Sequence, residues 1–195
     1  MRRCDLQENE LQTLAASGAL ACFGLSRRAA LWQVARLGRP AGPLLDQLTD
    51  PEPSPLPEMT PAEETMADYG TAQLTLGPHP MSYYREMLEK KGVTPAGGLD
   101  ALPNGARVRT AGSVIVRQRP GTAKGLLFLT LEDETGMSQA VVSPDLLQQH
   151  RKLIVGSPGL LVEGILQKRD GTISVKGEKF WSLKELVAVP SHDFR

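Results

Sequence analysis

Cysteine and histidine are scarce in this sequence. Its 195 residues include two cysteines, Cys4 and Cys22, and only three histidines. A zinc site or a disulfide framework needs several such side chains at short, regular spacing. The sequence therefore predicts two reduced thiols, no bound metal and no cofactor.

Long apolar runs are also missing, although 41% of the residues are hydrophobic. No stretch approaches the roughly 18 uninterrupted apolar residues that a membrane-spanning helix needs. The charged start, Met1-Arg2-Arg3-Cys4-Asp5, is not followed by the apolar segment of a signal peptide. These two absences predict a cytoplasmic protein with no membrane contact.

The sequence has no net charge, yet its two halves differ. Residues 1–100 hold 9 Lys and Arg against 13 Asp and Glu, whereas residues 101–195 hold 13 against 9. A polyanion is attracted to the part of a protein with excess positive charge. Any nucleic acid is therefore expected on the second half of the chain.

Helical periodicity dominates the beginning of the chain. Leucines recur near a 3.6-residue period over residues 6–37, and Gly18 and Gly24 interrupt the run. Ser26 is typical of a residue that caps the start of a helix. We expect residues 1–37 to form short helices that are too small to bury a core alone, and that are the tail of a larger helical region.

Proline dominates the next segment. Residues 38–62 contain seven prolines, which fix φ and remove backbone donors, so this segment is expected to be an extended linker. Thr60, with Pro61 and Glu63 after it, predicts the start of a new helix. Residues 63–103 are then expected to hold connecting helices, one of them over residues 81–91.

From residue 104 onward, β-branched residues replace the helical pattern. A helix is expected at 144–154, and the Asp-Gly pair at 170–171 predicts a tight turn between the last two strands. Three strands, a helix and two strands are the order of a five-stranded OB barrel. We therefore predict an α+β fold with an OB domain over 104–187 and a tail over 188–195. The strands are expected at 108–118, 126–131, 137–142, 160–167 and 172–176.

Two adjacent segments carry a family resemblance. The run from Val114 to Gly125, VIVRQRPGTAKG, leads into LLFLTLEDETG at 126–136. Together they resemble the C-terminal OB segment of the bacterial error-prone DNA polymerase, a paralogue of the C-family replicative alpha subunit. Asp68-Tyr69-Gly70 and the terminal SHDFR extend the resemblance. Residues 11–20, LQTLAASGAL, are similar to the family's segment that closes its helix-hairpin-helix region.

The resemblance implies nucleic-acid binding without catalysis. The family synthesises DNA on a template during damage-tolerant replication, repair and SOS mutagenesis, and its catalytic regions precede the segment that this chain resembles. The chain by itself is therefore expected to be no enzyme. Its expected partners are single-stranded DNA, the polymerase core and accessory mutagenesis proteins.

The acidic residues support the same expectation. Nucleotidyl transfer needs carboxylates that hold two Mg²⁺ ions about 3.5–4 Å apart. Glu132, Asp133 and Glu134 form the only tight acidic cluster in the OB region. Consecutive strand residues point to alternate faces, so these three are expected to form a solvated exit from the strand, with no catalytic or metal-binding role.

Basic residues are candidates for phosphate contacts. In OB folds, oligonucleotides bind to the face of strands 2 and 3 and to the loops after strands 1 and 4, here 118–125 and 168–171. The arginines at 107, 109, 117 and 119 would share one face of an unbroken strand, unless a bulge at Gly112 changed the alternation. Phe128 is expected either to stack on a base or to lie in the core. The candidate nucleic-acid-binding residues are Arg107, Arg109, Arg117, Arg119, Lys124, Phe128, Lys168 and Arg169.

Two other functions remain open. The anticodon-binding OB domain of an aminoacyl-tRNA synthetase also combines a phenylalanine-containing strand, an acidic turn and a valine-rich third strand. The helices upstream of the OB region and its C-terminal position argue against it, because synthetase OB domains of this type usually precede the catalytic domain. The remaining alternative is an adaptor that docks on protein partners of a polymerase.

Overall fold

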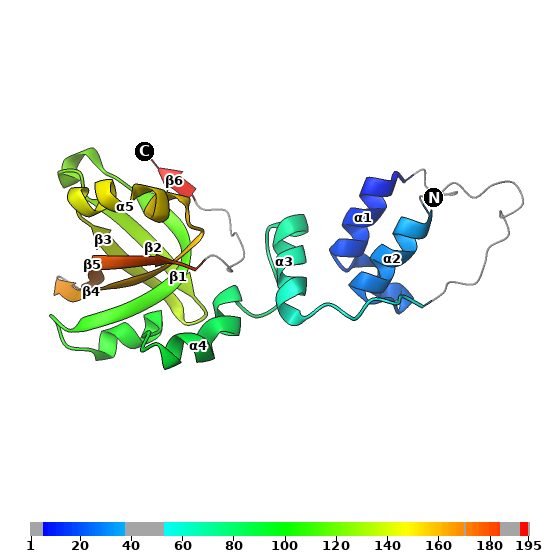
Figure 1. Cartoon of the computed structure of the whole chain (residues 1–195), viewed down its shortest axis with the longest axis horizontal. Helices are drawn as coiled ribbons and strands as arrows, with labels where there is room; N and C mark the ends of the chain where they lie inside the picture. Colours follow the sequence, from blue (N-terminus) through cyan, green and yellow to red (C-terminus); the bar gives the residue numbers. More distant parts are fainter. Residues whose placement is uncertain (1–5, 38–52, 170, 184–191, 195) are drawn as a thin grey trace, which may run out of the picture. The chain divides into compact units, whose positions relative to one another are not determined.

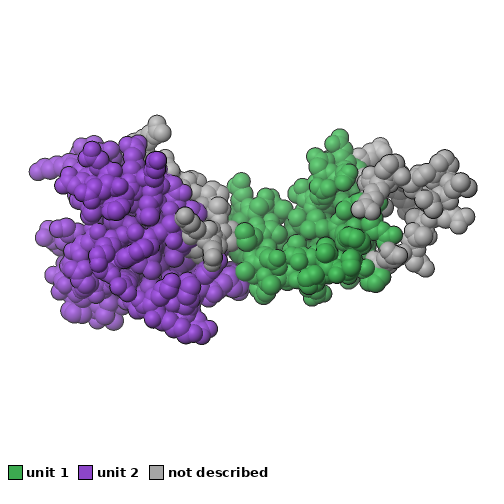
Figure 2. Space-filling view, in the orientation of Figure 1, with its two compact units in different colours: residues 1–77 green, residues 78–195 purple. Residues whose placement is uncertain are grey.

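The structure, a computed structural model, describes residues 6–37, 53–169, 171–183 and 192–194. The chain divides into two compact units, residues 1–77 and residues 78–195 (Figure 2). Within the described ranges, no helix has the length and apolar character needed to cross a membrane. The finer division expected from the sequence stays a prediction, and most of its proline-rich linker, residues 38–52, lies outside the described residues.

The first unit contains a pair of helices with a small apolar core (Figure 1). Gly18 and Gly24 adopt positive φ values of 80° and 74°, so they end the helical segments where the sequence predicted breaks. The Ser26 hydroxyl accepts a hydrogen bond from the Ala29 amide (3.4 Å), as expected of a helix cap. The elements are α1 (Glu8–Ala16), the 3₁₀ helix η1 (Ala19–Phe23), α2 (Arg27–Leu37) and α3 (Pro61–Ala72).

Helix α3 begins at the predicted residue. Thr60 accepts a hydrogen bond from the Glu63 amide (3.3 Å), and Glu63 accepts one from the Thr60 amide (2.8 Å). Pro61 occupies the first turn, where its missing N–H leaves no bond unmade. A reciprocal capping box therefore defines this helix start, as the local sequence predicted.

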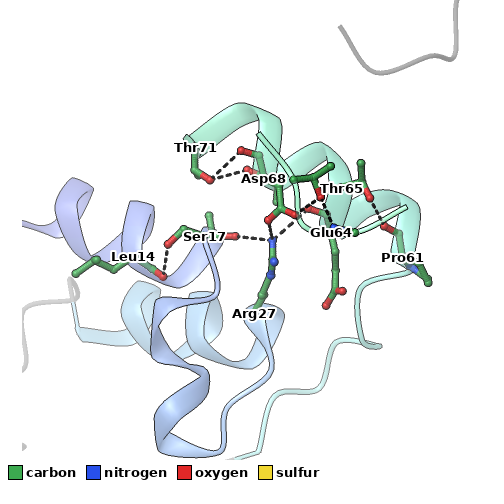
Figure 3. A network of polar contacts seen from close by, with 12 residues as sticks. Leu14, Ser17, Arg27, Pro61, Glu64, Thr65, Asp68 and Thr71 are labelled. Carbon is green, nitrogen blue, oxygen red and sulfur yellow. Dashed lines mark hydrogen bonds and ion pairs between the residues drawn. The ribbon is translucent and has the colours of Figure 1, made fainter. Parts of the chain in front are cut away.

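Arg27 joins the helical pair to α3. Its Nη1 atom lies 2.6 Å from Asp68 Oδ1 and donates hydrogen bonds to the carbonyls of Ala16 and Glu64 (Figure 3). The second Asp68 oxygen accepts a hydrogen bond from the Thr75 hydroxyl (2.6 Å). One guanidinium thus holds three parts of the first unit together.

The second unit begins with short helices and continues as a barrel (Figure 1). The helix expected over 81–91 is divided into a 3₁₀ segment and a short α-helix. These elements pack on the barrel through a small cluster that includes Met81, Leu88 and Val93 from the helices and Ala111 and Leu161 from the strands. The helices are η2 (Pro80–Tyr84), α4 (Arg85–Lys90) and η3 (Ala96–Ala101).

The barrel has the predicted OB topology, with a helix between the third and fourth strands. The sheet order is β2-β3-β5-β4-β1-β6, and an additional pairing of β1 with β2 closes the barrel. Strand β6 (His192–Phe194) pairs in parallel with the end of β1. The other elements are β1 (Arg107–Gln118), η4 (Gly121–Ala123), β2 (Leu127–Asp133), β3 (Gly136–Val142), α5 (Pro144–Gly156), β4 (Gly159–Arg169) and β5 (Thr172–Ser182).

Strand β5 is longer than the sequence predicted, because it continues to Ser182 instead of ending near Lys176. Between Glu163 and Gly164 the β4–β5 register shifts, so that Gly164 pairs with Gly177 while Glu163 pairs with Lys179. A β-bulge of this kind changes which face the following residues occupy. Val175 and Phe180 can therefore both reach the apolar core.

Asp133 is buried, not solvated as the sequence led us to expect. Only 4% of it is exposed, and it accepts hydrogen bonds from the Ala96 amide (2.8 Å), from the Thr135 amide (2.8 Å) and from the Thr135 hydroxyl (2.6 Å). Arg85 Nη2 lies 3.1 Å from the same carboxylate, and Arg85 Nε contacts Glu134. Its hydrogen bond to Glu134 raises the pKa of Arg85 despite partial burial. This network attaches α4 and η3 to the β2–β3 turn.

We expect Asp133→Asn to destabilise the second unit by about 2–3 kcal/mol, because one acceptor oxygen becomes a donor that faces other buried donors. Urea unfolding followed by circular dichroism measures this loss. Glu132→Gln is the matched control, since its carboxylate is 36% exposed, and it should change stability by less than about 0.5 kcal/mol. Equal stability of the two variants would contradict the anchoring role of Asp133.

Candidate nucleic-acid interface

The outer surface of β2 and β3 is the natural starting point, because alternate residues of each strand face away from the core. Leu129 and Leu131 are fully buried, which places Phe128 and Thr130 on the opposite, outer side. Phe128 is partly exposed and pairs with Val141 of β3, while Thr130 pairs with Gln139. The sequence left open whether Phe128 lies in the core or on the binding surface, and in the structure it lies on the outer side of β2.

The same outer surface continues onto β5. Val141 pairs in parallel with Lys176, and Lys176 is exposed. A lysine thus lies one strand away from the partner of Phe128. Sequence reasoning missed Lys176. Because side chains alternate along a strand and Val175 is apolar, the sequence could have placed its neighbour Lys176 on the outer face. The sequence could not show that this strand pairs with β3.

Strand β1 does not keep the four arginines on one face. Its register with β2 shifts between Val114 and Val116, not at Gly112. After this shift Arg117 pairs with Leu129, a fully buried residue, so Arg117 faces the inside of the barrel. The expectation of a shared face is wrong, because the extra residue of a bulge reverses the alternation that follows it.

Arg117 is buried at the C-terminal end of α5. Only 7% of the residue is exposed. Its Nε donates a hydrogen bond to the carbonyl of Ile154 (3.2 Å), and its Nη2 donates one to the carbonyl of Ser157 (2.5 Å). The sequence made Arg117 a candidate for binding nucleic acid, but its donors serve these backbone carbonyls inside the barrel.

The loop between β1 and β2 keeps two exposed cations, Arg119 and Lys124. Lys124 adopts a positive φ of 49°, which ends η4 and turns the chain toward β2. No ion pair joins either side chain to another described residue. Because Leu127 pairs with Val142, this loop lies at the Val142 end of the β2–β3 surface.

The sequence placed Lys168 and Arg169 in a loop, but they are the last two residues of β4 and pair with Ile173 and Thr172 of β5. They lie toward the other end of that surface, because β5 starts beside them and runs parallel to β3. Lys168 Nζ contacts both the carbonyl and the carboxylate of Asp100, so it is partly used within the fold. Arg169 is exposed. The basic β1–β2 loop and the basic end of β4 therefore flank the outer surface of β2 and β3.

Arg107 and Arg109 lie elsewhere on the barrel. They face outward where β1 pairs with β4, and Arg109 Nε lies 2.7 Å from Glu163 Oε2. Arg107 Nη1 lies 2.7 Å from Glu178 Oε2. The hydrogen bond from Arg109, reinforced by Lys179, lowers the pKa of Glu163. The structure thus separates this pair from Arg119, Lys124 and Phe128.

The described residues include no group of three or more His, Cys, Asp or Glu side chains able to hold a metal ion. The arrangement consists of a partly exposed aromatic ring, a nearby lysine and two flanking basic segments, the β1–β2 loop and the end of β4. Such a surface can stack bases and neutralise phosphates.

Comparison with known families agrees with this architecture. Residues 106–183 match a family model described as an OB-fold nucleic acid binding domain. The asparaginyl-tRNA synthetase of Pyrococcus horikoshii has a structure that covers 45% of this chain and 21% of its own, with 30% identity and a TM-score of 0.36. A small single-stranded DNA binding protein from Mycoplasma pneumoniae covers 43% of this chain and 98% of its own, with 15% identity and a TM-score of 0.36.

Relatives by sequence cover nearly the whole chain. The error-prone DNA polymerase of Caulobacter vibrioides is 43% identical over 182 residues, which are 90% of this chain and 17% of the relative. That of Mycolicibacterium paratuberculosis is 39% identical over 194 residues, or 99% of this chain and 18% of the relative. The chain thus spans less than a fifth of the length of these relatives. The chain is homologous to one segment of the bacterial error-prone DNA polymerases, and its residues 106–183 are an OB-fold nucleic acid binding domain.

Proposed function

We propose that the OB domain binds single-stranded DNA across the outer surface of β2 and β3. In this proposal the chain positions template strand for an error-prone DNA polymerase during damage-tolerant replication, and it has no catalytic activity of its own. The polymerase core and accessory mutagenesis proteins are its proposed protein partners, and the cytoplasm is its proposed location.

One observation carries the proposal: Phe128 faces outward between the basic β1–β2 loop and the basic end of β4 instead of packing in the core. A base can stack on a partly exposed ring, which contributes roughly 1–3 kcal/mol per base. Arg119 and Lys124 lie at one end of the surface and Arg169 at the other, while Lys176 lies beside Val141. The cations can therefore contact phosphates on both sides of a stacked base.

The residues at this surface predict binding with little sequence preference. Stacking accepts every base, and phosphate contacts carry no direct sequence information. The two relatives by sequence described above favour a polymerase setting over an aminoacyl-tRNA synthetase, since both are error-prone DNA polymerases.

Replacing both Arg119 and Lys124 by alanine should weaken binding to oligo-dT and reduce its dependence on salt. Each phosphate contact to a single strand contributes about 0.7 to the slope of log K against log salt, so the slope should flatten by roughly 1.4. Phe128→Leu should weaken binding by about 1–3 kcal/mol with little change of slope, because stacking releases few counterions. Fluorescence anisotropy at several salt concentrations measures both quantities.

Lys152→Ala is the charge control, since Lys152 is exposed on α5 and belongs neither to β2 and β3 nor to the basic segments that flank them. It should change neither affinity nor slope appreciably. A folded double variant that binds oligo-dT with the affinity and salt dependence of the parent would refute the proposed surface. Tighter binding of folded tRNA or of an accessory protein to the same chain would then favour one of the two alternative functions.

A further inference from the structure

A cluster of opposite charges lies on the other side of the barrel, where β1, β4 and β5 are neighbours. Glu163 is at its centre. Its carboxylate lies 2.7 Å from Arg109 Nε, 3.3 Å from Lys179 Nζ and 3.6 Å from Arg107 Nη1. Three cations on adjacent strands therefore surround one carboxylate.

The carboxylate lies beneath the cations. The Glu163 side chain is 7% exposed, whereas those of Arg107, Arg109 and Lys179 are 57%, 47% and 63% exposed. Arg109 uses Nε for Glu163 and Nη1 for the Lys91 carbonyl (3.0 Å), which leaves Nη2 for a further acceptor among its five N–H donors. The cluster thus presents donors to solvent while Glu163 holds them in place.

An exposed aromatic residue adjoins these cations. Trp181 is 43% exposed, and it lies two residues after Lys179 on the same strand, so both side chains point to the same face. Trp181 pairs with Leu161 of β4, which lies two residues before Glu163 and therefore on the same face of that strand. We call Arg107, Arg109, Lys179 and Trp181, with Glu163 beneath them, the Glu163 patch.

The surface beside the patch is hollowed. A pocket of about 370 Å³ is lined by Gly92, Thr94, Leu102, Arg107, Arg109 and Glu163, among others. This volume falls in the range of about 300–1,000 Å³ that small-ligand sites occupy. The pocket gives a sugar–phosphate unit room to approach both guanidinium groups.

Cross-strand pairs connect the patch with the proposed binding surface. Phe128 pairs with Val141, and Val141 pairs with Lys176. Lys176 in turn pairs with Ile165, and Ile165 pairs with Arg107. This row of residues crosses five neighbouring strands in four steps of about 4.8 Å each. Phe128 and Arg107 are therefore separated by roughly 19 Å across the sheet, and Lys176 lies midway between them.

We propose that the Glu163 patch is a second contact for the same nucleic-acid strand, which reaches it from the β2–β3 surface by crossing Lys176. The cations of the patch bind phosphates, and Trp181 stacks on a base. The inference rests on the proposed function, and it adds a length requirement. A strand of about five nucleotides occupies the β2–β3 surface alone, whereas one of about fifteen occupies both, within the range of roughly 4–16 nucleotides known for OB folds.

The test compares two oligonucleotide lengths on the full chain. Replacing Lys179 by alanine together with Trp181 by leucine should weaken binding of a dT oligomer of about fifteen nucleotides by about tenfold or more, because a stack and a phosphate contact are lost. Binding of a dT oligomer of about five nucleotides should change by less than about twofold. Lys152→Ala should affect neither length, and circular dichroism confirms that each variant is folded.

A second variant should act in the opposite direction. Glu163→Gln keeps an oxygen that can accept a hydrogen bond from Arg109, but it removes the negative charge that competes with phosphate for the three cations of the patch. Affinity for the longer oligomer should rise by about two- to fivefold, and its salt dependence should steepen, since cations freed from the carboxylate attract the strand more strongly. A variant that merely damaged the fold would not bind more tightly.

The outcomes separate the two proposals. In one outcome, Phe128→Leu and the Arg119 and Lys124 double variant weaken binding of both lengths, but the Lys179 and Trp181 double variant binds the longer oligomer as the parent does. This result overturns the Glu163 patch alone. Equal losses for both lengths also overturn it, because the patch would then belong to the primary surface. No effect from any of these variants overturns the proposed function as well.

Discussion

Replacing Arg117 by alanine should destabilise the second unit by about 3–5 kcal/mol. The variant leaves the carbonyls of Ile154 and Ser157 without the donors that serve them, and each unsatisfied buried group costs roughly 1–3 kcal/mol. The Ile154 carbonyl has no helical alternative, because the residue four positions later is Pro158, which lacks an N–H. A positive charge at the C-terminal end of α5 is lost as well.

Thermal and urea unfolding measure this effect, and we expect Tm to fall on the order of 10–20 °C. Arg119→Ala is the matched control, since it removes an exposed arginine only two residues away. It should change stability by less than about 0.5 kcal/mol while weakening binding to oligo-dT. If Arg117→Ala were as stable as the parent and bound DNA more weakly, Arg117 would belong to the interface after all.

Replacing Gly164 by alanine should have an effect of similar size, of about 3 kcal/mol or more. An added Cβ would lie 2.0 Å from the Lys176 carbonyl oxygen and 2.8 Å from its carbonyl carbon. Both atoms belong to the backbone of β5, so the two strands must separate. Overpacking of this kind costs typically 1–3 kcal/mol, and the separation also breaks hydrogen bonds of the β4–β5 ladder.

Urea unfolding of Gly164→Ala tests this close approach. Gly121→Ala is the control, because nothing lies within 4 Å of its added Cβ and its φ is not in the left-handed region. The control should change stability by less than about 0.5 kcal/mol. A Gly164→Ala variant as stable as the control would show that the β4–β5 pairing has room at this position, which contradicts the close approach of Gly164 to the β5 backbone.

Local sequence was sufficient to predict the order of the elements. The capping box at Thr60 and the two glycine breaks depend on neighbouring residues, whose preferences act within a few positions. Four of the five barrel strands begin and end within about two residues of the predicted limits, because runs rich in β-branched residues, bounded by turn residues, mark them in the sequence itself. The OB topology followed from that order, and the family resemblance from the residues at 114–136.

Only the tertiary structure decided which side chains face the proposed ligand. The bulge between Val114 and Val116 depends on how β1 fits β2, and it turns Arg117 into the barrel. The bulge beside Gly164 depends on how β4 fits β5, and it allows both Val175 and Phe180 to reach the core. Lys176 joins the outer surface only because β5 pairs with β3. These features depend on contacts between residues far apart in sequence, and a shift of one residue in register exchanges the inner and outer faces of a strand.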